Sequence, residues 1–179
     1  MHAPVAPDRP AVTFREVRKE DLPVIFALRR DVVLQSFLLT VPDALDDAAL
    51  HAWLERRQRD PGGLFRVVED ARGDVIGYAQ ISRVQRRNRS GYPGIALAEH
   101  ARGRGLGQAT YRKLIRAARD ELGLIKLLSE VRVDNFAAMR YNILVGFRMI
   151  GTLRDDYTDG DGRRYDVLLF ELMLDEADV

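Results

Sequence analysis

Apolar and polar residues follow two periods along this chain, and each change of period marks the border of an element. Short runs rich in Val, Ile, Leu and Phe between turn residues predict strands, and apolar positions three or four residues apart predict helices. The expected strands cover residues 12–17, 64–69, 75–84, 92–97, 125–133, 148–157 and 163–174. The expected helices begin near Asp21, Asp46, Gly107 and Asn135.

The first of these helices should start at Asp21, with Pro23 in its first turn. We expect it to run on without a break until Pro42-Asp43. Its buried stripe should consist of Leu22, Ile25, Phe26, Val32 and Val33.

Strands and helices alternate without an internal repeat or a second linker, and 179 residues fit one domain with a real core. We therefore expect a single α/β (α+β) domain over residues 12–179. A loose tail should cover residues 1–11, where Ala and Pro are frequent. The elements predict a mixed central sheet of about seven strands flanked by about four helices.

Charge and composition narrow the chemistry. Lys and Arg number 28 against 27 Asp and Glu, and the net charge of +1 argues against a polyanion as the main partner. The chain has no cysteine, which excludes disulfides, thiolate catalysis and cysteine-bound zinc. Its three histidines, His2, His51 and His100, are too scattered to predict a metal site. No run approaches the roughly 20 apolar residues of a membrane helix, so we expect a cytoplasmic protein without a membrane partner.

A basic loop offers one alternative, nucleic-acid binding through Arg83, Arg86, Arg87 and Arg89. No aromatic residue alternates with these arginines to stack on bases. The loop therefore fits a solvated face better, and we expect no nucleic-acid partner.

A glycine-rich loop between the strand 92–97 and the following helix is the most informative stretch. Gly103, Gly105 and Gly107 lack a Cβ, so a ligand can lie directly against their backbone N–H groups. The first turn of a helix adds unpaired N–H donors and the positive end of its dipole. Since Arg102 and Arg104 add formal positive charge, the loop predicts a cradle for a phosphate or pyrophosphate.

The spacing excludes two common phosphate loops, because a P-loop lysine and the Gly-x-Gly-x-x-Gly pattern are both absent. The string Arg102-x-x-Gly105-x-Gly107, preceded by a short strand, resembles the coenzyme A signature of the GNAT family of N-acetyltransferases. The order of elements is similar to that family as well, over roughly residues 13–174. The resemblance implies a splayed parallel pair of strands, 92–97 and 125–133, at the centre of the sheet, with acetyl-CoA in the gap.

The resemblance also implies which residues contact the coenzyme. Ile95, Ala96 and Leu97 would lie along the pantetheine arm, Ile95 and Leu97 through their backbone groups. The pyrophosphate would be held by Arg102, Gly103, Arg104, Gly105, Leu106, Gly107 and Gln108.

A second segment, residues 135–147, resembles the family pattern Asn-x-x-Ala-x-x-x-Tyr-x-x-x-Gly-Phe. The resemblance implies that Asn135 contacts the coenzyme arm and that a Tyr protonates the leaving sulfur. This chain has Asn142 at the Tyr position, and Tyr141 one residue earlier is rotated by about 100° on a helix. Asn142 can donate an N–H to the sulfur, whereas Tyr141 is either catalytic or a packed aromatic residue.

The general base is the least defined part of the predicted site. Glu99 is the nearest carboxylate to the cradle, with a solvent-facing loop residue as the alternative. Glu130 on the next strand is a similar candidate. Because general acid assistance is typically worth about 10²–10⁴-fold, losing the family Tyr should slow the reaction rather than abolish it.

Together these residues predict an N-acetyltransferase that moves an acetyl group from acetyl-CoA to a primary amine by direct attack, with no metal. The amine could belong to a small molecule, amino acid, antibiotic or peptide terminus. The alternative is a coenzyme A-binding module with little or no turnover. An acidic hairpin at residues 155–161 either attracts a cationic amine or is a solvated turn. Homodimers are common in the family, and the sequence leaves the oligomeric state open.

Overall fold

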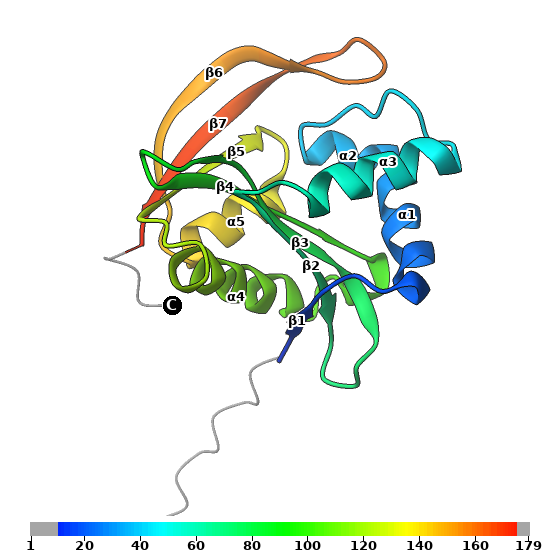
Figure 1. Cartoon of the computed structure of the whole chain (residues 1–179). Helices are drawn as coiled ribbons and strands as arrows, with labels where there is room; N and C mark the ends of the chain where they lie inside the picture. The colour runs from blue at the N-terminus through cyan, green and yellow to red at the C-terminus, as the bar shows by residue number, and fades with distance from the viewer. Residues whose placement is uncertain (1–10, 175–179) are drawn as a thin grey trace, which may run out of the picture.

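A computed structural model describes residues 11–174, and their strands form a single sheet (Figure 1). The strands are β1 (Thr13–Arg15), β2 (Leu64–Glu69), β3 (Val75–Gln85), β4 (Ser90–Leu97), β5 (Lys126–Arg132), β6 (Arg148–Thr158) and β7 (Arg164–Met173). The helices are α1 (Leu22–Arg30), α2 (Val32–Phe37), α3 (Asp47–Gln58), α4 (Leu106–Asp120) and α5 (Phe136–Leu144), with short 3₁₀ turns at Lys19–Asp21 and Glu99–Ala101.

Among residues 11–174 the sheet has seven strands in the order β1-β2-β3-β4-β5-β7-β6, and only β4 and β5 run parallel. These two strands pair only at Ser90 with Lys126 and at Gly91 with Leu127. Beyond that point they diverge, while β5 stays paired with β7 along its whole length. The predicted mixed sheet with a splayed central pair is therefore confirmed.

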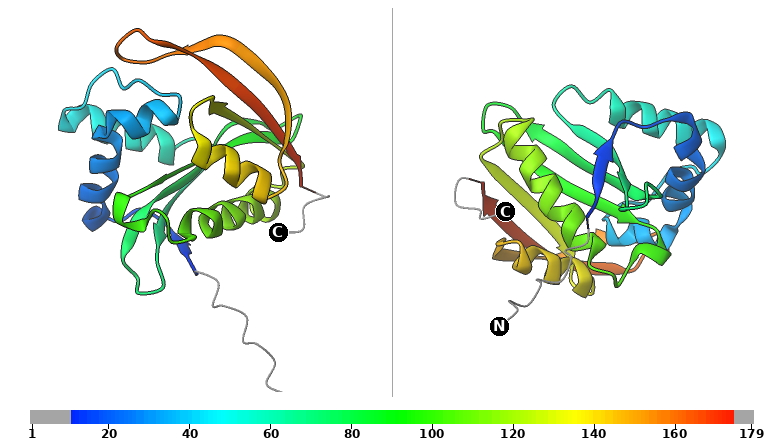
Figure 2. Two further views of the ribbon diagram at one scale, coloured as in Figure 1. Left: turned by 180° about the vertical axis from the view of Figure 1, so that it is seen from behind. Right: turned by 90° about the horizontal axis from the view of Figure 1, so that it is seen from below.

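A hydrophobic core lies on each face of the sheet, because successive strand residues point to opposite sides. Val67 and Val68 of β2 are both fully buried, one in each core. Helices α1 to α3 cover one face (Figures 1 and 2). On that face Trp53 packs edge-on against Tyr78. Helices α4 and α5 cover the other face, where Leu114 is fully buried. The helices on both faces therefore pack against the sheet on either side of the point where β4 and β5 diverge.

The predicted continuous first helix is wrong. The chain leaves the helical conformation at Asp31, where ψ is 91°, and the Asp31 carboxylate accepts the N–H of Leu34 to begin α2. Val32 and Val33 are consequently 58% and 63% exposed rather than buried. Because of this break five α-helices flank the sheet among residues 11–174, instead of about four.

The other boundaries differ only slightly from the expected ones. Strand β1 is shorter than residues 12–17, and β4 begins at Ser90 instead of residue 92. The expected tail over residues 1–11 lies almost wholly outside the described residues. No helix in the described part of the chain is both long and apolar enough to cross a membrane.

A close approach of β3 and β4 gives a stability prediction. A Cβ at Gly77 would lie 2.0 Å from the carbonyl oxygen of Ala96, a backbone atom that the β3–β4 ladder holds in place. We expect Gly77→Ala to lower the free energy of unfolding by about 1–3 kcal/mol or more, measured by urea denaturation. Gly160→Ala is the control, since a Cβ there meets no atom within 4 Å, and it should change stability by less than about 0.5 kcal/mol. Equal stability of the two variants would contradict the close approach.

Candidate active site

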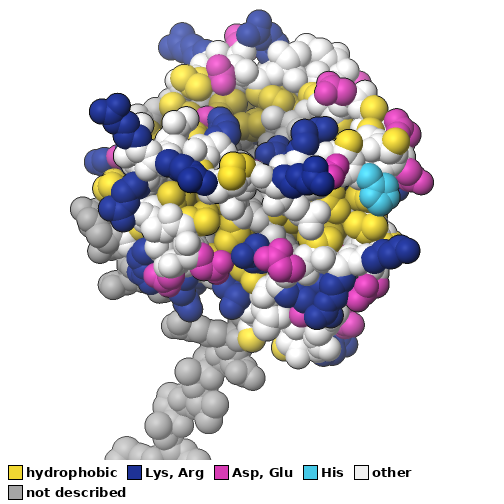
Figure 3. Space-filling view, viewed as in Figure 1, with side chains coloured by type: hydrophobic (Ala, Val, Ile, Leu, Met, Phe, Trp, Pro, Cys, Tyr) yellow, Lys and Arg dark blue, Asp and Glu magenta, His cyan; other side chains and the backbone are white. Residues whose placement is uncertain are grey.

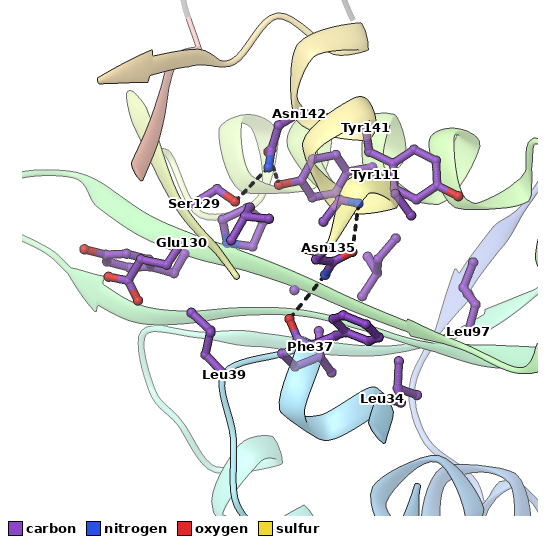
Figure 4. Close-up of a pocket in the computed structure, with 18 of the residues that line it drawn as sticks. Leu34, Phe37, Leu39, Leu97, Tyr111, Ser129, Glu130, Asn135, Tyr141 and Asn142 are labelled. Atoms are coloured by element: carbon purple, nitrogen blue, oxygen red, sulfur yellow. Dashed lines mark hydrogen bonds between the residues drawn. The ribbon is translucent and has the colours of Figure 1, made fainter. Parts of the chain in front are cut away.

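A cleft of about 880 Å³ lies where β4 and β5 diverge. Helix α2 and the loop after it form one wall, with Leu34, Phe37 and Leu39 pointing inward (Figure 4). Strands β3, β4 and β5, helix α5, the start of the glycine loop and single residues of α3 and α4 form the rest. The cleft therefore connects the glycine loop with the helices on the opposite face of the sheet.

One edge of β4 faces this cleft with its backbone. The N–H of Ala98, directly after β4, donates to the carbonyl of Ile76 in β3, and alternate residues of an antiparallel strand point their backbone groups to the same neighbour. Ala96 therefore points its backbone groups to β3, is fully buried and does not line the cleft. The backbone groups of Ile95 and Leu97 point the other way, and both residues line the cleft.

The glycine loop presents a row of free donors. Gly103 and Gly105 have φ values of 73° and 76°, and α4 begins directly afterwards without a side-chain cap. The backbone N–H groups of residues 103–108 donate to no other residue among 11–174. Gly103 lines the cleft, and residues 104–108 continue from its rim. This arrangement fits an anion such as a pyrophosphate.

The side chain of Arg102 points toward the end of β4 rather than toward the glycine loop. Its Nε donates to the Leu97 carbonyl at 3.1 Å, and its Nη2 lies 3.9 Å from a carboxylate oxygen of Asp31. Arg102 thus fixes the end of β4 beside α2, while Arg104 is exposed in the loop.

Two predicted residues of α5 face different parts of the cleft. Asn135 caps the helix by accepting the N–H of Ala138, and its Nδ2 donates to the Phe37 carbonyl at 3.3 Å (Figure 4). Asn135 therefore connects α5 with the end of α2. Tyr141 lies over the start of α4, since a Cβ at Gly107 would come within 2.8 Å of the tyrosine hydroxyl. Tyr141 therefore stands at the glycine-loop end of the cleft.

Asn142 belongs to a buried polar group of three side chains that all line the cleft. The Tyr111 hydroxyl donates to Asn142 Oδ1 at 2.9 Å, and Asn142 Nδ2 donates to Ser129 Oγ at 3.1 Å (Figure 4). Burial raises the pKa of the Tyr111 phenol, an effect that the nearby Ser129 hydroxyl partly opposes. Tyr111 therefore remains a hydrogen-bond donor at physiological pH.

Some charged and polar side chains of the cleft lining have partners within the protein and others have none. Arg83 donates to both carboxylate oxygens of Glu130, at 3.2 and 2.7 Å, and lies 3.4 Å over the ring of Tyr92. Arg57 is half-buried and forms no ion pair or hydrogen bond with residues 11–174. Gln80 Oε1 is buried without a hydrogen-bond partner in the same part of the chain. The cleft thus holds an unpaired cation and an unpaired acceptor.

Glu99 lies outside this arrangement. It is exposed in the turn Glu99–Ala101 and does not line the cleft. The carboxylates that do line it are Glu130 and Asp134, and Asp134 accepts from Arg132. Its position makes Glu99 a poor candidate for the base. No three His, Cys, Asp or Glu side chains gather as a metal-ligand set among residues 11–174.

The sequence-based interpretation missed Arg57, Gln80, Tyr111 and Ser129. A usable signal existed only for Ser129, a polar residue at an inward position of the apolar strand 125–133. Tyr111 fits the apolar stripe of α4 and reads as an ordinary core residue. Arg57 and Gln80 follow no local pattern, because only the folded chain brings them to the cleft.

The basic loop and the acidic hairpin have structural contacts. Arg86 donates to the Pro61 carbonyl and Arg89 to the Gly123 carbonyl, so both fasten neighbouring loops. Asp159 accepts from the Tyr165 hydroxyl and from the N–H groups of its own turn. On the face shown in Figure 3, basic and acidic side chains are interspersed.

Comparison with known proteins agrees with this geometry. The profile of the Acetyltransferase (GNAT) domain matches residues 11–148. The L-methionine sulfoximine/L-methionine sulfone acetyltransferase of Pseudomonas aeruginosa is 28% identical over 170 residues, covering 92% of this chain and 96% of that protein. The L-amino acid N-acetyltransferase AaaT of Escherichia coli is 28% identical over 143 residues, covering 79% and 85% respectively.

A solved structure shows the same fold. The spermidine N-acetyltransferase from Vibrio cholerae, in complex with CoA and spermine, superimposes with a TM-score of 0.83 at 23% identity. The match covers 92% of this chain and 96% of that one. The chain therefore belongs to the GNAT family of acetyltransferases, and its chemistry is the acyl-CoA-dependent transfer of an acetyl group to an amine.

Proposed function

We propose that this enzyme acetylates the amino group of a small molecule that also carries a carboxylate, such as an L-amino acid. The observation that carries the proposal is Arg57, a half-buried arginine that lines the cleft without an anionic partner among residues 11–174. A guanidinium can hold a carboxylate through two parallel hydrogen bonds.

The relatives support an acceptor of this class. The two amino-acid acetyltransferases are 28% identical over most of the chain, and their named substrates combine an amino group with a carboxylate. The spermidine enzyme, at 23% identity, shares the fold. A polyamine would need free carboxylates, whereas Glu130 and Asp134 already contact Arg83 and Arg132.

The coenzyme has a continuous path in this arrangement. We infer that its diphosphate binds the N–H groups of residues 103–108 and that its pantetheine arm follows the free edge of β4 at Ile95 and Leu97. The thioester then reaches the part of the cleft where β4 and β5 begin to diverge, beyond the paired residues Gly91 and Leu127. Gln80 lines the cleft, and once its buried side-chain amide turns toward the ligand, Oε1 can accept an N–H of the incoming amine and so direct the amine lone pair at the thioester carbonyl. We place the reaction in the cytoplasm, because acetyl-CoA is an intracellular metabolite.

Arg57→Ala tests the acceptor. We expect KM for L-methionine sulfone to rise about 10- to 100-fold with little change in kcat, since a hydrogen-bonded ion pair with the carboxylate is lost. Steady-state kinetics, with thiol release as the readout, would measure both constants. The control is Arg56→Ala, which removes an exposed neighbouring arginine outside the cleft lining and should leave KM unchanged.

A substrate panel completes this test. The native enzyme should acetylate L-amino acids and their sulfone and sulfoximine derivatives in preference to the corresponding amines without a carboxylate. Acetylation of spermidine alone, or an equal effect of both arginine variants, would refute the proposed acceptor.

Gly105→Glu tests the coenzyme site. Glutamate brings a negative charge to the start of α4 and should abolish coenzyme A binding in calorimetry. Gly105→Asn is the control, because asparagine tolerates the left-handed conformation, with φ of 76°, and adds no charge. The Asn variant should bind within about tenfold of the native protein. Unchanged binding by the Glu variant would contradict the cradle.

A further inference from the structure

Thioester aminolysis needs stabilisation at a second place besides the carbonyl. When the carbon–sulfur bond breaks, negative charge develops on the coenzyme sulfur, and a fixed hydrogen-bond donor there lowers the barrier. The assignment of that donor rests on the proposed function, because it requires the coenzyme to lie along β4.

Ser129 lies where that path ends. It stands on β5 two residues beyond Leu127, the last residue of β5 that pairs with β4. It lines the cleft although it is only 7% exposed. Its neighbours on the same face of β5, Leu127 and Val131, are apolar core residues. Ser129 is therefore the polar side chain that this face of β5 offers to this part of the cleft.

The hydrogen bonds around Ser129 have a defined direction. Tyr111 donates to the Asn142 carbonyl, and the Asn142 amide donates to Ser129 Oγ. Ser129 thus accepts a hydrogen bond from the protein, and its rotatable O–H can point either at the Tyr111 oxygen, where it opposes the rise in the phenol pKa, or at a ligand in the cleft. Donors in such a chain polarise one another, which strengthens the last one.

The other polar side chains fit this role less well. The Tyr141 hydroxyl lies against Gly107 at the opposite end of the cleft. The Tyr111 proton is directed at Asn142, and Asn142 directs an N–H at Ser129. Ser129 is thus the member of the group whose donor is left for the cleft.

We propose that the Ser129 hydroxyl donates a hydrogen bond to the sulfur of the departing coenzyme A thiolate, with Asn142 and Tyr111 as its positioning residues. The amine nitrogen forms a bond to the carbonyl carbon, and the carbon–sulfur bond breaks with its electron pair on sulfur. The proton released from the nitrogen goes to water, and Ser129 keeps its own proton. Coenzyme A leaves as a stabilised thiolate.

The test measures the thiol of bound coenzyme A, because a donor to the thiolate lowers its pKa. Thiolate absorbance of the native complex should titrate below the value of about 8.5 for a free thiol, and that of Ser129→Ala at or above it. In the same variant kcat should fall about 10- to 100-fold, with the KM of the amine little changed.

Two further variants make the test specific. Ser129→Thr keeps the hydroxyl and should keep the lowered thiol pKa, whereas Tyr111→Phe should raise it less than Ser129→Ala does. An unchanged thiol pKa in Ser129→Ala, or a larger effect of Tyr111→Phe, would overturn the assignment. Thermal unfolding of each variant shows whether it folds. Failure of the native protein to bind coenzyme A would refute the proposed function, and this inference with it.

Discussion

The whole site depends on one interruption of backbone pairing, between β4 and β5. Buried N–H and C=O groups normally find partners, and a sheet usually supplies them along its full width. Past Gly91 and Leu127 these two strands supply none to each other, and Ile95 and Leu97 turn their backbone groups to the cleft. The fold tolerates this because β3 and β7 hold the other edges of the two strands. An extended ligand with amide groups can then pair with β4 as a missing strand would.

Side chains from both halves of the sheet also connect across this gap. Arg83 at the end of β3 holds Glu130 of β5 with two hydrogen bonds, and so crosses the divergence next to its apex. Arg132 of β5 donates to the hydroxyl of Ser36 and thereby holds α2 against the opposite wall. Arg102 fixes the far end of β4. The side chains that a ligand contacts are therefore already ordered in the free protein, and binding costs less conformational entropy.

The sequence predicted those features that depend on local backbone needs. Apolar periodicity located the strands, and the spaced glycines located the loop, where Gly105 requires a left-handed conformation. The break at Asp31 was missed because two apolar valines follow it, and their exposure depends on how α2 docks. Tyr111 and Asn142 are 31 residues apart in the chain, so their hydrogen bond leaves no local pattern. Long-range packing thus decides the catalytic part of the site.

The asparagine at position 142 makes sense only within this packing. An amide accepts from Tyr111 through Oδ1 and donates to Ser129 through Nδ2, two atoms that point in different directions, whereas a phenol would have to do both through one oxygen and would compete with the Tyr111 ring for the same buried space. With Asn142 in place of a tyrosine on α5, the hydrogen-bond donor to the sulfur is Ser129 on β5. Such a site needs no strong acid, because a thiol with a pKa of about 8.5 is already a fair leaving group near neutral pH. Stabilising the thiolate by a fixed hydrogen bond is then sufficient, and the amine alone has to lose a proton.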